Sequence, residues 1–127
     1  MNKTKKSILI VEDNLINARL LAEYLKRKEI DYLLAYDGET AVQCVKENKD
    51  ISLVLMDIGL PKMSGEEAMN EIKKMRTDLP VIAQTAYTFS DSEEEFLEAG
   101  FDDYLSKPIN FYVLDKMLSK YYHVSYV

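Results

Sequence analysis

Two apolar runs in this sequence end abruptly in carboxylates. The first run, residues 8–11, is followed by Glu12 and Asp13. The second run, residues 53–56, is followed by Asp57. Short apolar runs of this kind are typical of strands that are buried on both faces of a parallel sheet. A carboxylate at the end of such a strand is costly unless something compensates its charge, so the pattern predicts a charged site at two strand ends.

Three carboxylates at one place would raise one another's pKa values unless a cation were bound. A set of oxygen ligands favours a hard divalent ion, Mg²⁺ with Mn²⁺ as an alternative. Two further runs end on Thr85 and on Lys107. A hydroxyl and an ammonium beside a metal-bound carboxylate would bind an oxyanion, as phosphoryl transfer requires. We therefore predict that Asp57 is a nucleophile that forms an acyl phosphate.

The elements that must position these residues alternate between strand and helix. The predicted strands are residues 8–11, 32–36, 51–56, 81–85 and 103–106. The first three predicted helices are residues 15–28, 39–48 and 65–76. A fourth helix is predicted to start near residue 91, and a last helix at Pro108. This alternation predicts an α/β fold, a doubly wound (βα)5 flavodoxin-like three-layer sandwich with a parallel five-stranded sheet in the order 2-1-3-4-5. The order places the first and third strands together, and with them Glu12, Asp13 and Asp57.

Local signals mark the ends of the first and third helices. Asn14 is expected to cap the first helix, whose buried stripe is expected to begin at Leu15 and continue through Ala18. Ser64 and Glu67 have the spacing of a capping box before the third helix.

Signals near the C-terminus are of the same kind. Ser90 or Asp91 is expected to cap an acidic fourth helix, and Gly100 fits the left-handed position after it. Pro108 is expected to occupy the first position of the last helix.

Composition narrows the class of protein. With 127 residues the chain is expected to form a single domain. Its formal charge of −6 argues against nucleic-acid binding, which needs clustered Lys and Arg. No apolar run is long enough for a secretory signal or a membrane span, so no membrane contact by this domain is expected. A single cysteine fits a reducing cytoplasm.

Taken together, the polar strand ends resemble the receiver (CheY-like) domain of two-component response regulators. The resemblance is carried by Glu12-Asp13, Asp57 with Pro61, Thr85-Ala86, and Tyr104 followed by Lys107-Pro108. It covers residues 7–121, which would form the core of a receiver domain spanning residues 1–127. The resemblance implies a phosphoacceptor switch of a phosphorelay.

The resemblance also implies roles for the residues at the strand ends. Asp57 would accept a phosphoryl group from a phosphohistidine of a histidine kinase or a histidine phosphotransfer domain. Asp13, Asp57 and the backbone carbonyl of Gly59 would bind Mg²⁺ directly, whereas Glu12 would act largely through water. No other cofactor is implied.

Further roles concern the response to phosphorylation. Lys107 would pair with Asp57 and then with the phosphate, Thr85 would move inward to bond a phosphate oxygen, and Tyr104 would follow. A downstream protein would bind the face formed by the fourth helix, the fifth strand and the fifth helix. The domain itself would be a phosphoacceptor with slow autophosphatase activity, although its parent protein could be a histidine kinase.

Two rival functions conflict with the local chemistry. A haloacid dehalogenase-like phosphatase needs a second Asp two residues after its nucleophile, and that position is Gly59. A flavodoxin-like FMN carrier needs a phosphate loop rich in Ser, Thr and Gly after its first strand. The acidic segment 12–14 would instead repel phosphate.

Two origins stay open for the domain. It is either a stand-alone single-domain response regulator or the receiver of a hybrid sensor histidine kinase. Residues 12–17 and the segments 85–86 and 100–104 resemble hybrid-kinase receivers, which favours the second origin. The expected compartment is the cytoplasm, as the cytoplasmic portion of a membrane protein in the hybrid case. The expected state is a monomer or weak dimer.

Overall fold

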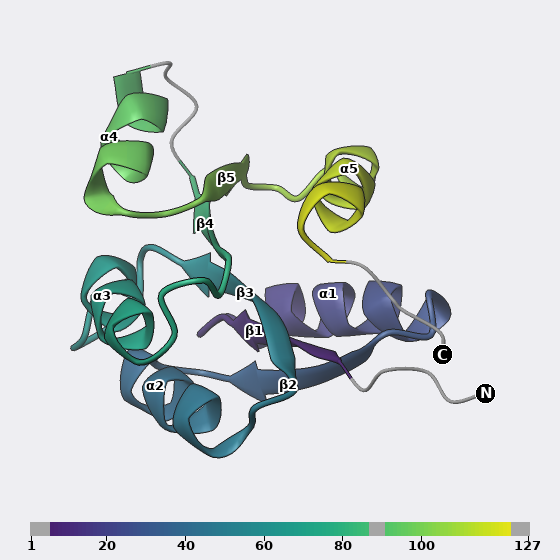
Figure 1. The fold of residues 1–127 in the computed structure, drawn as a ribbon. Helices are drawn as coiled ribbons and strands as arrows, with labels where there is room; N and C mark the ends of the chain where they lie inside the picture. Colours follow the sequence, from purple (N-terminus) through teal and green to yellow (C-terminus); the bar gives the residue numbers. More distant parts are fainter. Residues whose placement is uncertain (1–5, 87–90, 123–127) are drawn as a thin grey trace.

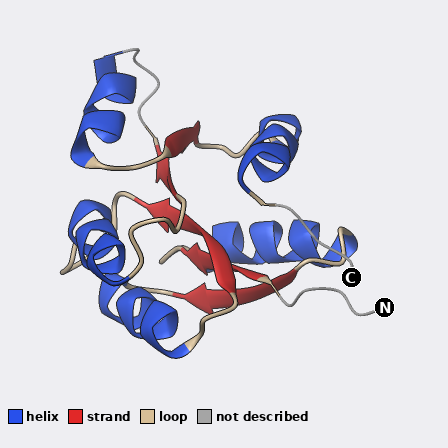
Figure 2. Cartoon of the chain, viewed as in Figure 1, coloured by secondary structure: helices blue, strands red, loops and turns tan. Residues whose placement is uncertain are grey.

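A parallel sheet lies at the centre of the computed structural model, which describes residues 6–86 and 91–122 (Figures 1 and 2). The strands are β1 (Ser7–Val11), β2 (Asp31–Ala35), β3 (Ile51–Asp57), β4 (Val81–Thr85) and β5 (Asp103–Ser106). The helices are α1 (Leu15–Arg27), α2 (Gly38–Glu47), α3 (Gly65–Met75), α4 (Asp91–Ala99) and α5 (Phe111–Tyr121). The strand order is β2-β1-β3-β4-β5 with all pairs parallel, which confirms the predicted fold.

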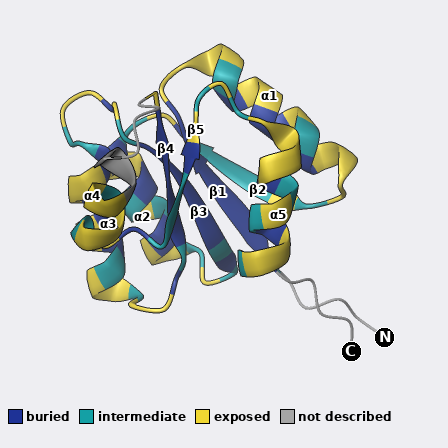
Figure 3. Ribbon diagram, turned by 90° about the horizontal axis from the view of Figure 1, so that it is seen from above, coloured by how far each residue is buried: buried dark blue, intermediate teal, exposed yellow. Residues whose placement is uncertain are grey.

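Helices cover both faces of the sheet (Figure 1). Helices α1 and α5 lie on one face, and α2, α3 and α4 lie on the other. Each face has its own apolar cluster, and Ile8 and Leu55 belong to the cluster beside α1 and α5 while Leu9 and Met56 belong to the other. The central strands β1, β3 and β4 are therefore buried on both sides, the edge strands β2 and β5 are partly buried, and the helices are exposed mainly on their outer faces (Figure 3). Two-sided burial explains the unbroken apolar runs of the sequence.

Three of the predicted helix ends are confirmed. The Asn14 side chain accepts a hydrogen bond from the N–H of Asn17 at 3.0 Å. Ser64 and Glu67 form a reciprocal capping box at the start of α3. Gly100 has a φ of +120°, a conformation that favours glycine. The predicted cap of α4, Ser90 or Asp91, lies outside the residues whose side chains the structure describes.

The predicted buried stripe of α1 was wrong at its first residue. Leu15 is 67% exposed, and Leu21 is buried instead. The first turn of α1 follows directly on the carboxyl end of β1, so it extends past the edge of the sheet. A side chain there has no strand beneath it, and both Leu15 and Ile16 face solvent.

The predicted start of the last helix was also wrong. Helix α5 begins at Phe111, and Pro108 lies in the preceding connection after a cis peptide bond from Lys107. Asn110 is the cap, because its side-chain oxygen accepts hydrogen bonds from the N–H groups of Tyr112 and Val113. A side-chain acceptor satisfies free N–H groups of the first turn, which a proline ring cannot do.

Residues 6–86 and 91–122 contain no helix that is both long and apolar enough to cross a bilayer.

Candidate functional site

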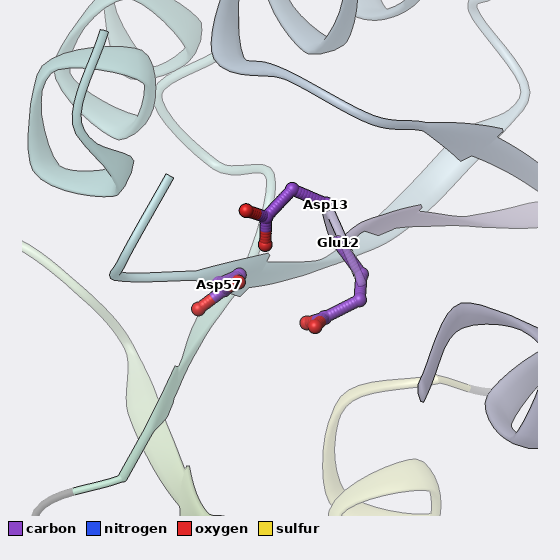
Figure 4. A group of neighbouring side chains, drawn as sticks. All are labelled: Glu12, Asp13 and Asp57. Atoms are coloured by element: carbon purple, nitrogen blue, oxygen red, sulfur yellow. The ribbon is translucent and has the colours of Figure 1, made fainter. Parts of the chain in front are cut away.

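Three carboxylates meet where β1 and β3 end. The register pairs Val11 with Met56, so Glu12 lies beside Asp57, and Asp13 follows in the loop. One carboxylate oxygen from each of the three residues lies within 4.8 Å of the others. Glu12 and Asp57 are buried, whereas Asp13 is exposed. Figure 4 shows the three side chains gathered at the two strand ends, so the juxtaposition that the strand order predicted is present.

Lys107 reaches this cluster from the end of β5. Its Nζ lies 3.1 Å from Asp57 Oδ1 and 3.1 Å from Glu12 Oε2. Asn17 of α1 donates a hydrogen bond from Nδ2 to Glu12 Oε1 at 3.3 Å. A single ammonium thus pairs with two buried carboxylates that belong to different strands.

Burial and neighbouring charges both shift the pKa values of the groups in this cluster. Desolvation raises the pKa of Glu12, and the nearby charge of Asp57 raises it further. Desolvation, then a hydrogen bond to Asp57, also raises the pKa of Asp13. Burial alone would lower the pKa of Lys107, but its hydrogen bond to Asp57 and the charge of Glu12 outweigh that effect and raise it. The carboxylates therefore hold the lysine in its charged form.

The acidic cluster has the composition of a site for a hard cation. Three carboxylates face one ammonium, so negative charge remains uncompensated among Glu12, Asp13 and Asp57. The donors are all oxygen atoms, which suit Mg²⁺ or Mn²⁺ better than a softer metal. Asp13 is exposed and gives an ion direct access from solvent.

Thr85 and Tyr104 occupy different places relative to the carboxylates. Thr85 ends β4, is 2% exposed, and lines the hollow that contains Asp57. Tyr104 lies on β5 opposite Ala83, packs against the cluster beside α2 and α3, and borders a separate hollow next to α5. The structure thus places Thr85 at the carboxylates and Tyr104 behind it on the neighbouring strand.

Two glycines shape the loop after Asp57. The N–H of Gly59 donates to Asp57 Oδ1 at 3.0 Å. A Cβ added to Gly65 would lie 2.3 Å from the backbone oxygen of Asp57 and 2.9 Å from Ile58 Cα, so only glycine permits this approach of α3. The helical pattern predicts Gly65 only as an ordinary residue of the third helix, although its place directly after the Ser64 cap was an available signal.

Two polar residues of the site were missed as site residues. Asn17, which donates a hydrogen bond to Glu12, enters the sequence prediction only as part of the family resemblance. Gln84 lies in register with Asp57 and lines the same hollow. The available signal was a polar side chain, Gln84, between the apolar run 81–83 and Thr85.

Comparisons with known proteins agree with this geometry. A family model described as the response regulator receiver domain matches residues 8–119. The chain is 35% identical over 128 residues to the hybrid signal transduction histidine kinase I of Dictyostelium discoideum, covering 91% of this chain and 7% of that protein. The first curated relatives that it matches are much longer, and the chain spans 7% to 28% of their length.

Solved structures give the same result. One is the receiver domain of the Saccharomyces cerevisiae response regulator Ssk1 in complex with the histidine phosphotransfer protein Ypd1, at 32% identity and a TM-score of 0.83, covering 95% of this chain and 91% of that one. Another is the receiver domain of the Pseudomonas aeruginosa sensor histidine kinase PA1611 with magnesium in its active-site cleft. It is 31% identical with a TM-score of 0.83, covering 94% of this chain and 98% of that one.

Proposed function

The chain belongs to the response regulator receiver domain family, and from this membership we propose that Asp57 accepts a phosphoryl group from a phosphohistidine of a partner protein. The observation that carries the proposal is the setting of this carboxylate. Asp57 is 4% exposed and is held by Lys107 Nζ and by the N–H of Gly59, beside Glu12 and Asp13. A carboxylate fixed in this way is oriented for attack at phosphorus.

The transfer itself is a displacement at phosphorus. A carboxylate oxygen of Asp57 forms the new O–P bond while the P–N bond of the phosphohistidine breaks, and the departing imidazole nitrogen keeps the electron pair of that bond. Lys107 lies within reach of the new phosphoryl oxygens because it already contacts Asp57 at 3.1 Å. The Thr85 hydroxyl would donate to another of these oxygens. Such catalysis consists mostly of positioning and charge neutralisation.

A Mg²⁺ ion, or Mn²⁺ as an alternative, would be held by Glu12, Asp13, Asp57 and the backbone carbonyl of Gly59. Bound there, the ion would neutralise charge on the phosphoryl oxygens. The all-oxygen donor set supports this assignment, as does the magnesium-bound PA1611 receiver at 31% identity. In this proposal Glu12, which is buried and already bonded to Lys107 and Asn17, contacts the ion through water.

The phosphodonor is proposed to dock on the first turns of α1. Leu15, Ile16 and Leu20 are 67%, 72% and 55% exposed, and they follow directly on the carboxylate loop. Exposed apolar side chains beside a reaction site favour a protein partner. The Ssk1 receiver bound to a histidine phosphotransfer protein supports a partner of that class or a histidine kinase.

The conformational response to phosphorylation is proposed to reach the face formed by α4, β5 and α5. Phosphorylation would draw Thr85 inward and Tyr104 after it. Tyr104 borders a hollow of about 290 Å³ that Val113 and Met117 of α5 also line, so its movement would change the face formed by α4, β5 and α5. A downstream protein bound at this face would sense that change. The domain would act as a monomer or weak dimer, and slow self-catalysed hydrolysis would reset it.

The parent protein is proposed to be a hybrid sensor histidine kinase, with residues 1–127 as its receiver domain in the cytoplasm. The 35% identity of this chain to part of a much longer hybrid kinase supports this origin. A stand-alone response regulator is the alternative.

Acetyl phosphate provides a direct test of the acceptor role. In the presence of Mg²⁺, the protein is expected to gain one phosphoryl group, measured as intact mass and as lability of the adduct to hydroxylamine. Chelation of the metal with EDTA is expected to prevent labelling. Labelling that persists without divalent metal would contradict the proposed site.

Exposed residues of α1 allow a test of the docking proposal. Ile16→Asp is expected to slow phosphoryl transfer from a histidine phosphotransfer protein by at least about tenfold, because it places a charge in an apolar interface. Labelling by acetyl phosphate is expected to stay unchanged. Leu97→Asp on α4, where the native side chain is 50% exposed, is the matched control and should leave both rates unchanged. Equal transfer to the Ile16 variant and the native protein would place the donor elsewhere.

A further inference from the structure

A buried glutamine lies in the wall of the carboxylate site. Gln84 is 1% exposed, and β4 pairs it with Asp57 of β3. Side chains alternate along a strand, and Ile82 belongs to the cluster beside α1 and α5, so Gln84 faces the same side. Ile10 belongs to that cluster too, which places Glu12 on this side of β1. Glu12, Asp57 and Gln84 therefore form a row across three adjacent strands.

Unpaired polar atoms lie at both ends of this row. Among the described residues, neither Nε2 nor Oε1 of Gln84 has a hydrogen-bond partner. Glu12 Oε2 likewise accepts no hydrogen bond within the described part of the chain, although it forms the ion pair with Lys107. Burying an unpartnered amide is costly compared with burying an apolar side chain of similar size. An amide kept in this position requires an explanation.

A narrow crevice adds a second observation at the same residue. A cavity of about 110 Å³ lies between α1 and the connection from β5 to α5. Asn17, Gln84 and Lys107 line both this crevice and the hollow of the carboxylates. Asn17 and Lys107 both bind Glu12. Gln84 is thus the third polar side chain around Glu12 in this wall, and its amide donor lies in the hollow that Glu12 also lines.

We propose that Gln84 is a positioning residue that replaces Lys107 as the partner of Glu12 when Asp57 is phosphorylated, an inference that rests on the proposed acceptor role. Phosphorylation adds about −1.5 to −2 charges and draws the Lys107 ammonium toward the phosphoryl group. Glu12 then loses part of the compensation for a buried carboxylate. The Nε2–H of Gln84 donates to Glu12 Oε2, which pairs two of the three atoms of this row that lack a hydrogen bond among the described residues. In the unphosphorylated protein the amide has no such partner among the described residues, and its burial is a cost that the phosphorylated state offsets.

Gln84→Leu separates this role from simple packing. Beryllofluoride with saturating Mg²⁺ serves as the phosphoryl mimic, with amide NMR shifts as the readout. The variant is expected to bind beryllofluoride about tenfold more weakly than the native protein, the effect of losing a hydrogen bond to a charged group. Its Mg²⁺ affinity without beryllofluoride should be unchanged, and its midpoint of urea unfolding should be equal or higher. Ile82→Leu, on the same face of β4, is the matched control and should leave beryllofluoride affinity unchanged.

A double-mutant cycle identifies the partner of the amide. In a Glu12→Gln background, Gln84→Leu is expected to have no further effect on beryllofluoride affinity, because the buried charge is gone. Should Gln84→Leu not fold, Gln84→Met replaces it in the same measurements. Native affinity in the Gln84 variant, or an equal effect in both backgrounds, would overturn the proposal. Failure of the native protein to respond to beryllofluoride would instead reject the acceptor role itself.

Discussion

Asp57→Asn is expected to abolish labelling by acetyl phosphate entirely. The amide of Asn has no carboxylate oxygen that can attack phosphorus. Its oxygen can still accept the hydrogen bond from the N–H of Gly59, which Asp57 Oδ1 now accepts at 3.0 Å, so the loop should keep its structure. Intact mass after incubation with acetyl phosphate and Mg²⁺ measures the result. No adduct should form on any time scale over which the native protein is labelled.

A matched control separates loss of the nucleophile from loss of one acidic group. Asp37 caps α2 by accepting a hydrogen bond from the N–H of Thr40 at 2.7 Å. Asp37→Asn removes a carboxylate while leaving a residue that caps equally well. This variant should be labelled like the native protein. An adduct on the Asp57 variant would mean that another side chain accepts the phosphoryl group.

Lys107→Ala is expected to eliminate the conformational response while leaving metal binding intact. The ammonium bridges Glu12 Oε2 and Asp57 Oδ1 at 3.1 Å each, and no other cation contacts both carboxylates among the described residues. Without it the acidic cluster is still complete, so Mg²⁺ should bind at least as tightly. Beryllofluoride should then cause no amide shifts on β5 or α5, because nothing transmits the new charge to that strand. NMR titration with Mg²⁺ measures metal binding, and NMR titration with beryllofluoride measures the conformational response.

Removal of this lysine should also destabilise the metal-free protein. Two buried carboxylates would lose their counterion, a change on the order of 3 kcal/mol in the free energy of unfolding, and Mg²⁺ should restore most of it. Lys73→Ala is the control, because Lys73 forms a different ion pair, with Asp102 at 2.7 Å. That variant should lose stability but keep the response to beryllofluoride. An unchanged response in the Lys107 variant would remove this residue from the mechanism.

The element order and the strand ends could be predicted because both are local properties. Buried parallel strands require apolar runs, and turn residues must close them, so the runs ending at Asp57 and Thr85 were visible in the sequence. The alternation of strands and right-handed connections predicts a doubly wound sheet, and 2-1-3-4-5 is one of the two common strand orders of such sheets. From that order alone, Glu12, Asp13 and Asp57 had to meet, and they do.

The remaining features depend on what lies above each strand end, and this is decided by elements far apart in the sequence. Leu15 fits an apolar stripe, but the sheet ends before its turn of α1, so it is exposed. Gln84 follows an apolar run like any polar strand end, yet α1 and the connection to α5 enclose it, and its amide has no hydrogen-bond partner within residues 6–86 and 91–122. Residue type and spacing thus determined which groups reach the site. Their burial and partners were decided by tertiary packing, because solvent exclusion and hydrogen bonding depend on neighbours that no local pattern records.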